Sequence, residues 1–283
     1  MQRLIFTNSR GQSVELTNSA PFILQKIEGT GKVDAEIQTS KAPYQDGETL
    51  QDVILSMRAV TIEGAVHGAD REDMYNKRQH LCSVFNPKLR EGVLTYQNDF
   101  ITKRILAVCD DGVDFKDRYG QNQLFSLSLI CSNPFWLDEY KTERVMQYQM
   151  GGLMFPLVLP TKFSETTYKR VLTNNGDVET PVEIEFYGPA INPTIRNNST
   201  GEYITVKRTL SDTDKLVIST EFGNKRVEIE ASDGSKTNVF NWIDIASTFF
   251  QLQVGENELE YITNSADLRS KVIVRYSNKY VGV

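Results

Sequence analysis

The stretch LFSLSLIC at residues 124–131 alternates apolar and polar side chains almost one by one. Successive side chains of a β-strand point to opposite faces of a sheet, so this alternation predicts a strand with one packed face. The residues predicted to share that buried face are Phe125, Leu127, Leu129 and Cys131. Because shorter runs with the same period recur along the whole chain, separated by turn residues, the sequence predicts a mainly β protein.

The segment at residues 70–85 departs from this period and predicts a helix. Asp70 is a suitable N-cap, the acidic residues of the first turn favour the positive end of the helix dipole, and Asn86 with Pro87 ends the helix. The apolar residues at helical spacing are Met74, Leu81, Cys82 and Phe85.

The length of 283 residues favours two domains of ordinary size. The tract GGLMFPLVLP at residues 151–160 carries two glycines and two prolines between strand-rich regions, which indicates a linker. We therefore predict a first domain at 1–150 containing the helix, a linker at 151–165 and a second domain at 166–283. In the second domain, short strands alternate with turn pairs such as Asn175-Gly176, a pattern typical of a β-sandwich.

The charge and the cysteines exclude several classes of protein. The net charge is −6, and each half of the chain, divided at Pro160, carries −3. A protein that grips DNA or an anionic membrane through phosphates needs a basic surplus, so neither partner is expected. Three cysteines without a CxxC pair do not form a disulfide framework, and no apolar run reaches the ~20 residues of a membrane-spanning helix.

No motif in the sequence predicts a catalytic, cofactor or metal site. The GxSxG, P-loop, HExxH and GxGxxG patterns are all absent. Two pairs of carboxylates, Glu183 with Glu185 and Glu228 with Glu230, leave a wall-degrading hydrolase as an alternative. The spacing of two residues is, however, what any solvent-facing side of a strand produces.

The densest acidic cluster lies in CDDGVDFKDR and offers oxygen atoms of the kind that Ca²⁺ prefers. Its carboxylates are those of Asp110, Asp111, Asp114 and Asp117. The cluster lacks the EF-hand spacing, since Gly112 comes too early and no glutamate closes the loop. We expect a hairpin turn at Asp111-Gly112 instead, and ion binding stays open.

Trp242 and Tyr203 are the candidate saccharide contacts, because an exposed aromatic ring can stack on a sugar. Core packing is the alternative for both rings. Turns are expected to depend on five further residues, of which the three glycines are expected to adopt positive φ. These residues are Gly47, Pro87, Pro134, Gly176 and Gly255.

The order of segments along both domains resembles the distal tail proteins of long-tailed bacteriophages. The resemblance is carried in the first half by FTNSRGQSVEL at 6–16, RAVTIEGAV at 58–66 and LFSLSLICSNPFW at 124–136. In the second half it is carried by NNGDVETPVEIEFYGPAINPTIRN at 174–197 and LQVGENELEY at 252–261. It covers nearly the full length of the chain.

This resemblance implies an N-terminal domain, barrel-like or sandwich-like with one helix, that closes into a homo-hexameric ring, and a C-terminal galectin-like β-sandwich. It implies a structural protein without enzymatic activity, made in the bacterial host cytoplasm and located at the distal end of the virion tail. The implied partners are further copies of the chain, the major tail tube protein and a tail tip protein, tail-associated lysin or tape-measure-linked protein, with no cofactor.

An alternative function is a carbohydrate-binding module that attaches to host cell-wall saccharide, through the second domain. A ring through which DNA passes should not hold the DNA, and the lack of a basic stripe is compatible with that passage.

Overall fold

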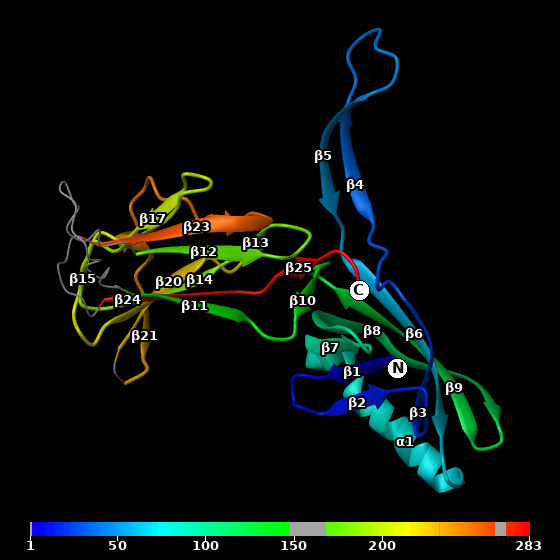
Figure 1. Ribbon diagram of the computed structural model, residues 1–283. Helices are drawn as coiled ribbons and strands as arrows, with labels where there is room; N and C mark the ends of the chain where they lie inside the picture. Colours follow the sequence, from blue (N-terminus) through cyan, green and yellow to red (C-terminus); the bar gives the residue numbers. More distant parts are fainter. Residues whose placement is uncertain (1, 148–167, 232, 264–269) are drawn as a thin grey trace, which may run out of the picture. The chain divides into compact units, whose positions relative to one another are not determined.

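The computed structural model describes residues 2–147, 168–231, 233–263 and 270–283. The chain forms two compact units. Unit 1 comprises Met1–Glu139 together with Tyr280–Val283, and unit 2 comprises Tyr140–Lys279. The strands of both units are drawn in Figure 1, and each unit is described separately below.

Unit 1 is built on an antiparallel sheet with the strand order β2-β1-β7-β8-β9-β6-β3, and β10 pairs with β8 at its side. The bounds are β1 (Arg3–Thr7), β2 (Ser13–Leu16), β3 (Phe22–Glu28), β6 (Arg58–His67), β7 (Gly92–Gln97), β8 (Thr102–Tyr119), β9 (Asn122–Cys131) and β10 (Trp136–Asp138). The two ends of this sheet meet, because the Thr17 amide donates to the Phe22 carbonyl at 3.1 Å and the Leu24 amide donates to the Thr17 carbonyl at 2.7 Å. The sheet therefore curls toward a barrel.

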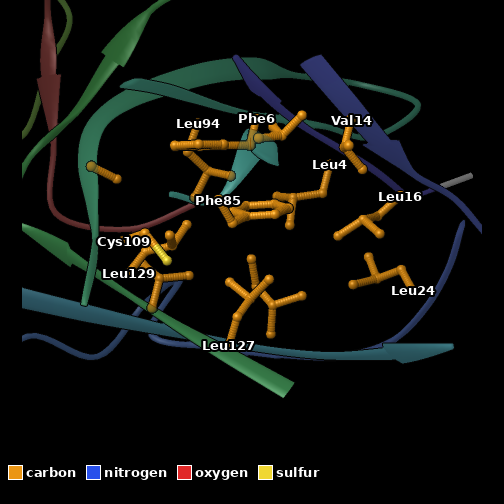
Figure 2. Close-up of a cluster of buried hydrophobic side chains, with 14 of the residues drawn as sticks. Leu4, Phe6, Val14, Leu16, Leu24, Phe85, Leu94, Cys109, Leu127 and Leu129 are labelled. Carbon is orange, nitrogen blue, oxygen red and sulfur yellow. The ribbon is translucent and has the colours of Figure 1, made fainter. Parts of the chain in front are cut away.

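The strand β9 confirms the alternation read from the sequence. Phe125, Leu127, Leu129 and Cys131 are at most 4% exposed, while the residues between them are only partly covered. Figure 2 shows Leu127 and Leu129 in one cluster with side chains from β1 and β2. Phe85 lies in the same cluster, and its ring stacks on Phe6 with centroids 4.8 Å apart. Packing of this kind is the main source of stability of a β-domain with one helix.

The helix α1 spans Arg71–Val84, inside the predicted range of 70–85. The Asp70 side chain is the N-cap and accepts a hydrogen bond from the Asp73 amide at 2.8 Å. Met74 and Leu81 are buried as expected, but Cys82 is exposed, which corrects its assignment to the apolar face. Pro87 opens the short 3-10 helix η1 (Pro87–Leu89), where its missing N–H has no cost.

The turn expected at Asp111-Gly112 is wrong. β8 continues through these residues as a bulge, with its pairing to β9 shifted between Cys109 and Val113 and with Gly112 at φ 84°. Extra residues in one strand of a pair bend that strand without ending it. The reversal comes later, at Gly120, which has φ 60°.

Two further strands of unit 1 form a separate hairpin, which we call the arm: β4 (Ala35–Ser40) and β5 (Thr49–Leu55). The strand β5 ends at Leu55 and β6 starts at Arg58, so the arm and the main sheet are separate along the chain. The arm stands clear of the other strands of unit 1 in Figure 1. Residues 41–48, with Gly47 at φ 78°, connect its strands.

Unit 2 is a sandwich of two antiparallel sheets, which confirms the predicted architecture. One sheet has the order β11 (Thr142–Gln147), β24 (Lys271–Tyr276), β14 (Glu183–Tyr187), β19 (Lys215–Ser219), β20 (Arg226–Glu230) and β21 (Lys236–Asn238). The other has the order β12 (Lys169–Asn174), β23 (Gly255–Ile262), β16 (Thr194–Asn197) and β17 (Tyr203–Thr205). The core lies between them, where Phe186 of the first sheet and Tyr261 of the second have ring centroids 5.8 Å apart.

Short elements complete unit 2. They are the pair β13 (Thr180–Pro181) with β22 (Gln251–Leu252), the pair β15 (Ala190–Ile191) with β18 (Thr209–Leu210), and the 3-10 helix η2 (Phe240–Trp242). The strand β25 (Lys279–Tyr280) leads the chain back to unit 1.

The units divide the chain differently from the predicted 1–150 and 166–283. β11 pairs along its whole length with β24, so residues 140–147 join unit 2. The last four residues join unit 1, far from their place in the sequence. The predicted linker at 151–165 lies outside the described residues. In the described part of the chain, no helix is long and apolar enough to cross a membrane.

Candidate interaction surfaces

The arm exposes apolar side chains that a soluble domain would normally bury. Ile37 is 63% exposed, Leu50 59% and Val53 48%. Nearly every residue of β4 and β5 is exposed on both faces of the hairpin. Because a lone two-stranded hairpin is marginally stable in water, an exposed apolar hairpin indicates a surface that another chain covers.

The strand register makes the arm amphipathic. Residues directly opposite each other in an antiparallel pair point to the same face, and Ile37 pairs with Val53 while Ala35 pairs with Leu55. The neighbouring pairs, Glu36 with Ile54 and Gln38 with Asp52, therefore face the other way. One face of the arm is therefore apolar, and the other combines the carboxylates of Glu36 and Asp52 with the exposed side chain of Ile54.

The base of the arm is held by a buried arginine on β6. Arg58 is 1% exposed, and its guanidinium Nη1 donates to the carbonyl oxygens of Gly29 at 2.6 Å, Thr30 at 3.2 Å and Lys32 at 3.1 Å. These three residues form the segment that leads from β3 into the arm. Five N–H groups in a rigid fork make a guanidinium suited to gather several carbonyls at one point.

Arg58 also fixes two segments that are distant in sequence. Its Nε donates to the Pro134 carbonyl at 2.7 Å, and its Nη2 donates to the Val281 carbonyl. The indole of Trp136 donates to the Thr30 carbonyl at 3.1 Å. Burial lowers the pKa of Arg58, but a guanidinium keeps its proton at neutral pH, so the site is a buried cation held by backbone dipoles.

A second surface of unit 1 combines arginines with aromatic rings. Arg78 of α1 lies over the ring of Phe115 at 4.1 Å and over that of Tyr75 at 5.2 Å, measured from the guanidinium carbon to the ring centroid. Arg71 lies 5.9 Å from the centroid of Tyr75. The hydrogen bond and charge of Arg71, followed by the charges of Arg118 and Arg78, lower the pKa of the Tyr75 phenol. We call these five residues the arginine–aromatic surface.

The carboxylates that the sequence offered as a hydrolase pair belong to an ion-pair network on the outer face of unit 2. Glu185 is 5% exposed and lies 2.6 Å from Arg275 and 3.0 Å from Lys215. Burial by itself raises the pKa of Glu185, but hydrogen bonds from Arg275, Tyr187 and Lys215 outweigh it and lower that pKa to about 2. A carboxyl with this pKa is ionised at neutral pH and does not act as a general acid.

The remaining three carboxylates are paired as well. Glu183 lies 3.3 Å from Arg226, Glu228 lies 3.8 Å from the same guanidinium, and Glu230 lies 3.4 Å from Lys215. These carboxylates and the neighbouring arginine and lysine side chains therefore neutralise one another on the surface of the sheet.

The acidic cluster at 110–117 is spread along a bulged strand. Asp114 forms an ion pair with Lys116, and Asp110 and Asp111 lie within the bulge between Cys109 and Val113. Among the residues that the structure describes, which include Asp111 and Asp117, no group of three metal-ligating side chains comes together.

The two candidate saccharide rings lie on separate elements of unit 2. Trp242 ends η2 and is half-buried, with the guanidinium carbon of Arg208 5.2 Å from its ring centroid. Tyr203 of β17 is half-buried too, with Arg196 at 5.8 Å. Each ring is therefore partly exposed beside a guanidinium, and Trp242 also packs against the core of unit 2, as the core-packing alternative expected.

The five predicted turn residues act in different ways. Gly255 adopts φ 93°, as Gly47 adopts positive φ at the arm tip, whereas Gly176 does not. The requirement at Gly176 is space, since a Cβ there would lie 2.5 Å from the Lys279 carbonyl oxygen. Pro134 contributes its carbonyl to Arg58, and Pro87 starts η1.

Sequence reasoning missed the arm and Arg58. The period-two alternation is weak here, because the register shifts after Gln38 and the connection over 41–48 is long. A signal was present: two β-prone runs flank a turn with Asp46-Gly47, which is typical of a hairpin. No pattern in the sequence marks an arginine within an apolar strand as the point where four segments meet.

Two sequence families match the chain. Residues 9–131 match the phage tail protein RIFT-related domain, and residues 175–280 match the C-terminal domain of the siphovirus-type tail component. No curated protein matches the chain.

Several solved structures share the fold. SPP1 Dit, described as a paradigm of the hub adsorption apparatus in phages that infect Gram-positive bacteria, has a TM-score of 0.70 at 14% identity, with 98% of each chain covered. The baseplate of phage P2 in its activated conformation with Ca has a TM-score of 0.60 at 14% identity, covering 100% of this chain and 99% of that one. The same baseplate with Sr has a TM-score of 0.60 at 13% identity, with both chains fully covered.

Proposed function

The chain belongs to the distal tail proteins of siphophages, which are structural components of the phage tail, and from this premise we propose that six copies close into a ring. The ring joins the major tail tube protein on one side to a tail tip protein, tail-associated lysin or tape-measure-linked protein on the other. It sits at the distal end of the virion tail and takes part in adsorption to the host. The chain is made in the cytoplasm of the bacterial host.

The observation that carries this proposal is the exposed, amphipathic arm of unit 1. Ile37, Leu50 and Val53 are about half exposed or more in the single chain. Burial contributes roughly 25 cal/mol for each Å² of apolar surface, so covering these side chains in an assembly is favourable. Cyclic rings need two different, complementary faces on each subunit, and an arm that reaches away from its own sheet supplies one of them.

The experiment that tests the ring is native mass spectrometry of the purified chain over a range of concentrations. The expected result is a six-copy species that disappears when residues 35–55 are replaced by a short Asn-Gly turn. Retention of both units in that variant is checked by circular dichroism and by its thermal transition. A wild-type chain that stays monomeric at tens of micromolar, and that also fails to bind tube and tip proteins, contradicts the proposal.

We propose further that the ring has no enzymatic activity and does not hold DNA. The paired state of the Glu183 and Glu185 carboxylates and the acidic balance of the chain support this. Release of sugar or peptide from host cell wall by the purified protein would contradict the first statement. Retention of DNA by the assembled ring at physiological salt would contradict the second.

A second candidate function is attachment of unit 2 to host cell-wall saccharide. It is favoured by the pairing of Trp242 and Tyr203 with Arg208 and Arg196, since a ring can stack on a sugar while a guanidinium donates to its hydroxyl groups. A glycan array with the full chain tests it. Binding that is lost in Trp242→Ala supports the function, and an array without signal contradicts it.

A further inference from the structure

The arm of one copy needs a matching surface on the next copy, and the sequence of the arm limits what that surface can be. Residues 35–55 contain four carboxylates, those of Glu36, Asp46, Glu48 and Asp52, against the single ammonium of Lys41. Two of these acids, Asp46 and Glu48, lie at the tip, where the chain is exposed. The arm is therefore an amphipathic hairpin with a net charge of −3.

The arginine–aromatic surface has the complementary properties. Arg71, Tyr75 and Arg78 follow one another at helical spacing and form one stripe of α1, which Cys82 continues. Tyr75 is 44% exposed, and Arg71 and Arg118 are exposed as well. Tyrosine and arginine are among the residues most enriched at the energetic centres of protein interfaces.

The positive charges of this surface are available to a partner. Two neighbouring carboxylates are already engaged, since Asp73 lies 2.6 Å from Lys77 and Asp114 pairs with Lys116. In the described part of the chain, no ion pair joins Arg71 or Arg118 to a carboxylate. Arg78 is fixed in place because it donates to the buried Gln123 at 3.2 Å and stacks on Phe115. A fixed guanidinium loses little entropy on binding.

Resting on the proposed ring, we propose that the arm of one copy docks on the arginine–aromatic surface of the adjacent copy. The apolar face with Ile37, Leu50 and Val53 covers the exposed ring of Tyr75. The acidic tip with Asp46 and Glu48 meets Arg71 and Arg118. The contact is head-to-tail, so each copy gives one arm and receives another, as a closed ring requires.

Charge reversal and its repair test this docking in the full-length chain. The double variant Arg71→Glu with Arg118→Glu is expected to raise the apparent dissociation constant of the assembly at least tenfold. The double variant Asp46→Arg with Glu48→Arg is expected to have the same effect. A chain with all four changes is expected to recover assembly, because the signs are complementary again. Arg10→Glu is the matched control, since Arg10 is exposed on the turn between β1 and β2 and belongs to neither surface.

Cross-linking provides a readout that does not depend on charge. Cys82 is exposed beside the stripe, whereas Cys109 and Cys131 are buried and burial raises the pKa of both thiols. In Lys41→Cys, a bis-maleimide is expected to join the arm of one copy to Cys82 of the next and to give a ladder of covalent species up to six chains. Cys82→Ser is expected to abolish the ladder.

The outcomes separate this docking from the ring itself. A wild-type chain that never assembles contradicts the proposed ring and the docking together. If the wild type assembles but the arginine reversals leave its assembly unchanged, only the docking is wrong. The same holds if the chain with all four substitutions does not recover assembly. If cross-links persist in Cys82→Ser and stop at two chains, the arm tips contact each other. That result also contradicts the docking.

Discussion

The guanidinium of Arg58 donates a hydrogen bond to the backbone carbonyl of Val281, a residue 223 positions further along the chain. The same guanidinium donates to the segment that leads into the arm and to the Pro134 carbonyl. A buried cation that is surrounded by carbonyl oxygens is stable only while all of them stay in place. The last residues of the chain therefore help to hold the base of the arm.

Arg58→Met is expected to lower the free energy of unfolding of unit 1 by about 3 kcal/mol, because it leaves several buried carbonyls without donors. Urea denaturation followed by the fluorescence of Trp136, which is buried in the same place, measures the loss. Arg10→Met, at an exposed position, should stay within about 0.5 kcal/mol of the wild type. An equal effect of the two substitutions would argue against a role of Arg58 in stability.

Removal of residues 281–283 is expected to loosen the base of the arm, because it takes away contacts that these residues make with the Arg58 site. The Arg58 guanidinium then loses the Val281 carbonyl, and the Thr30 carbonyl loses the Val283 amide. We expect faster hydrogen exchange at residues 29–32 and at Arg58, with unchanged exchange in unit 2. Unaltered protection of residues 29–32 in the truncated chain would show that the C-terminal residues do not support the arm base.

Gly29→Ala is expected to be far more damaging than Gly47→Ala. Both glycines have positive φ, at 87° and 78°, which costs a residue with a side chain roughly 1–2 kcal/mol. At Gly29 a Cβ would also lie 2.0 Å from the Ala59 carbonyl oxygen, whereas nothing lies within 4 Å at Gly47. Thermal unfolding of the two variants measures the difference, and similar melting temperatures would contradict it.

The stability of unit 2 is expected to fall in acid because of Glu185. Its pKa is about 2 in the folded chain and 4.5 in the reference state, so the folded state favours the ionised form. A lowered pKa gives stability that is complete above the unfolded value and is lost as the pH falls from about 4.5 toward 2. A shift of this size corresponds to an upper limit of about 3 kcal/mol.

Glu185→Gln is expected to be less stable than the wild type at neutral pH and to lose part of the pH dependence between 4.5 and 2. Urea unfolding at a series of pH values measures it, with Glu256→Gln, at an exposed position, as the control. A variant with the same pH profile as the wild type would show that Glu185 does not carry this dependence.

The parts of the fold that could be predicted are those with a strong local pattern. The alternation around Leu127 and Leu129 follows from burial of one face of a strand, and Asp70 caps the helix through a contact three residues away. The interaction surfaces could not be predicted in this way. Arg58 and Val281 meet only through tertiary structure, and the arm has a weak pattern because neither of its faces is buried within the chain.

Tertiary pairing also explains why the turn predicted at Asp111-Gly112 is wrong. An Asp-Gly pair supplies positive φ equally well to a hairpin turn and to a bulge, and only the pairing of β8 with β9 decides between them. The packing of Trp242, by contrast, could be predicted from the apolar residues beside it, because its half-buried ring packs against the core of unit 2.

Electron-microscope images of the assembled chain test the central claim most directly, because they report copy number and symmetry together. The account predicts six-fold rings with an open centre, and rings of the same diameter at the distal end of tails from which the protein is isolated. Class averages without six-fold symmetry, or tails that end without this chain, would contradict it.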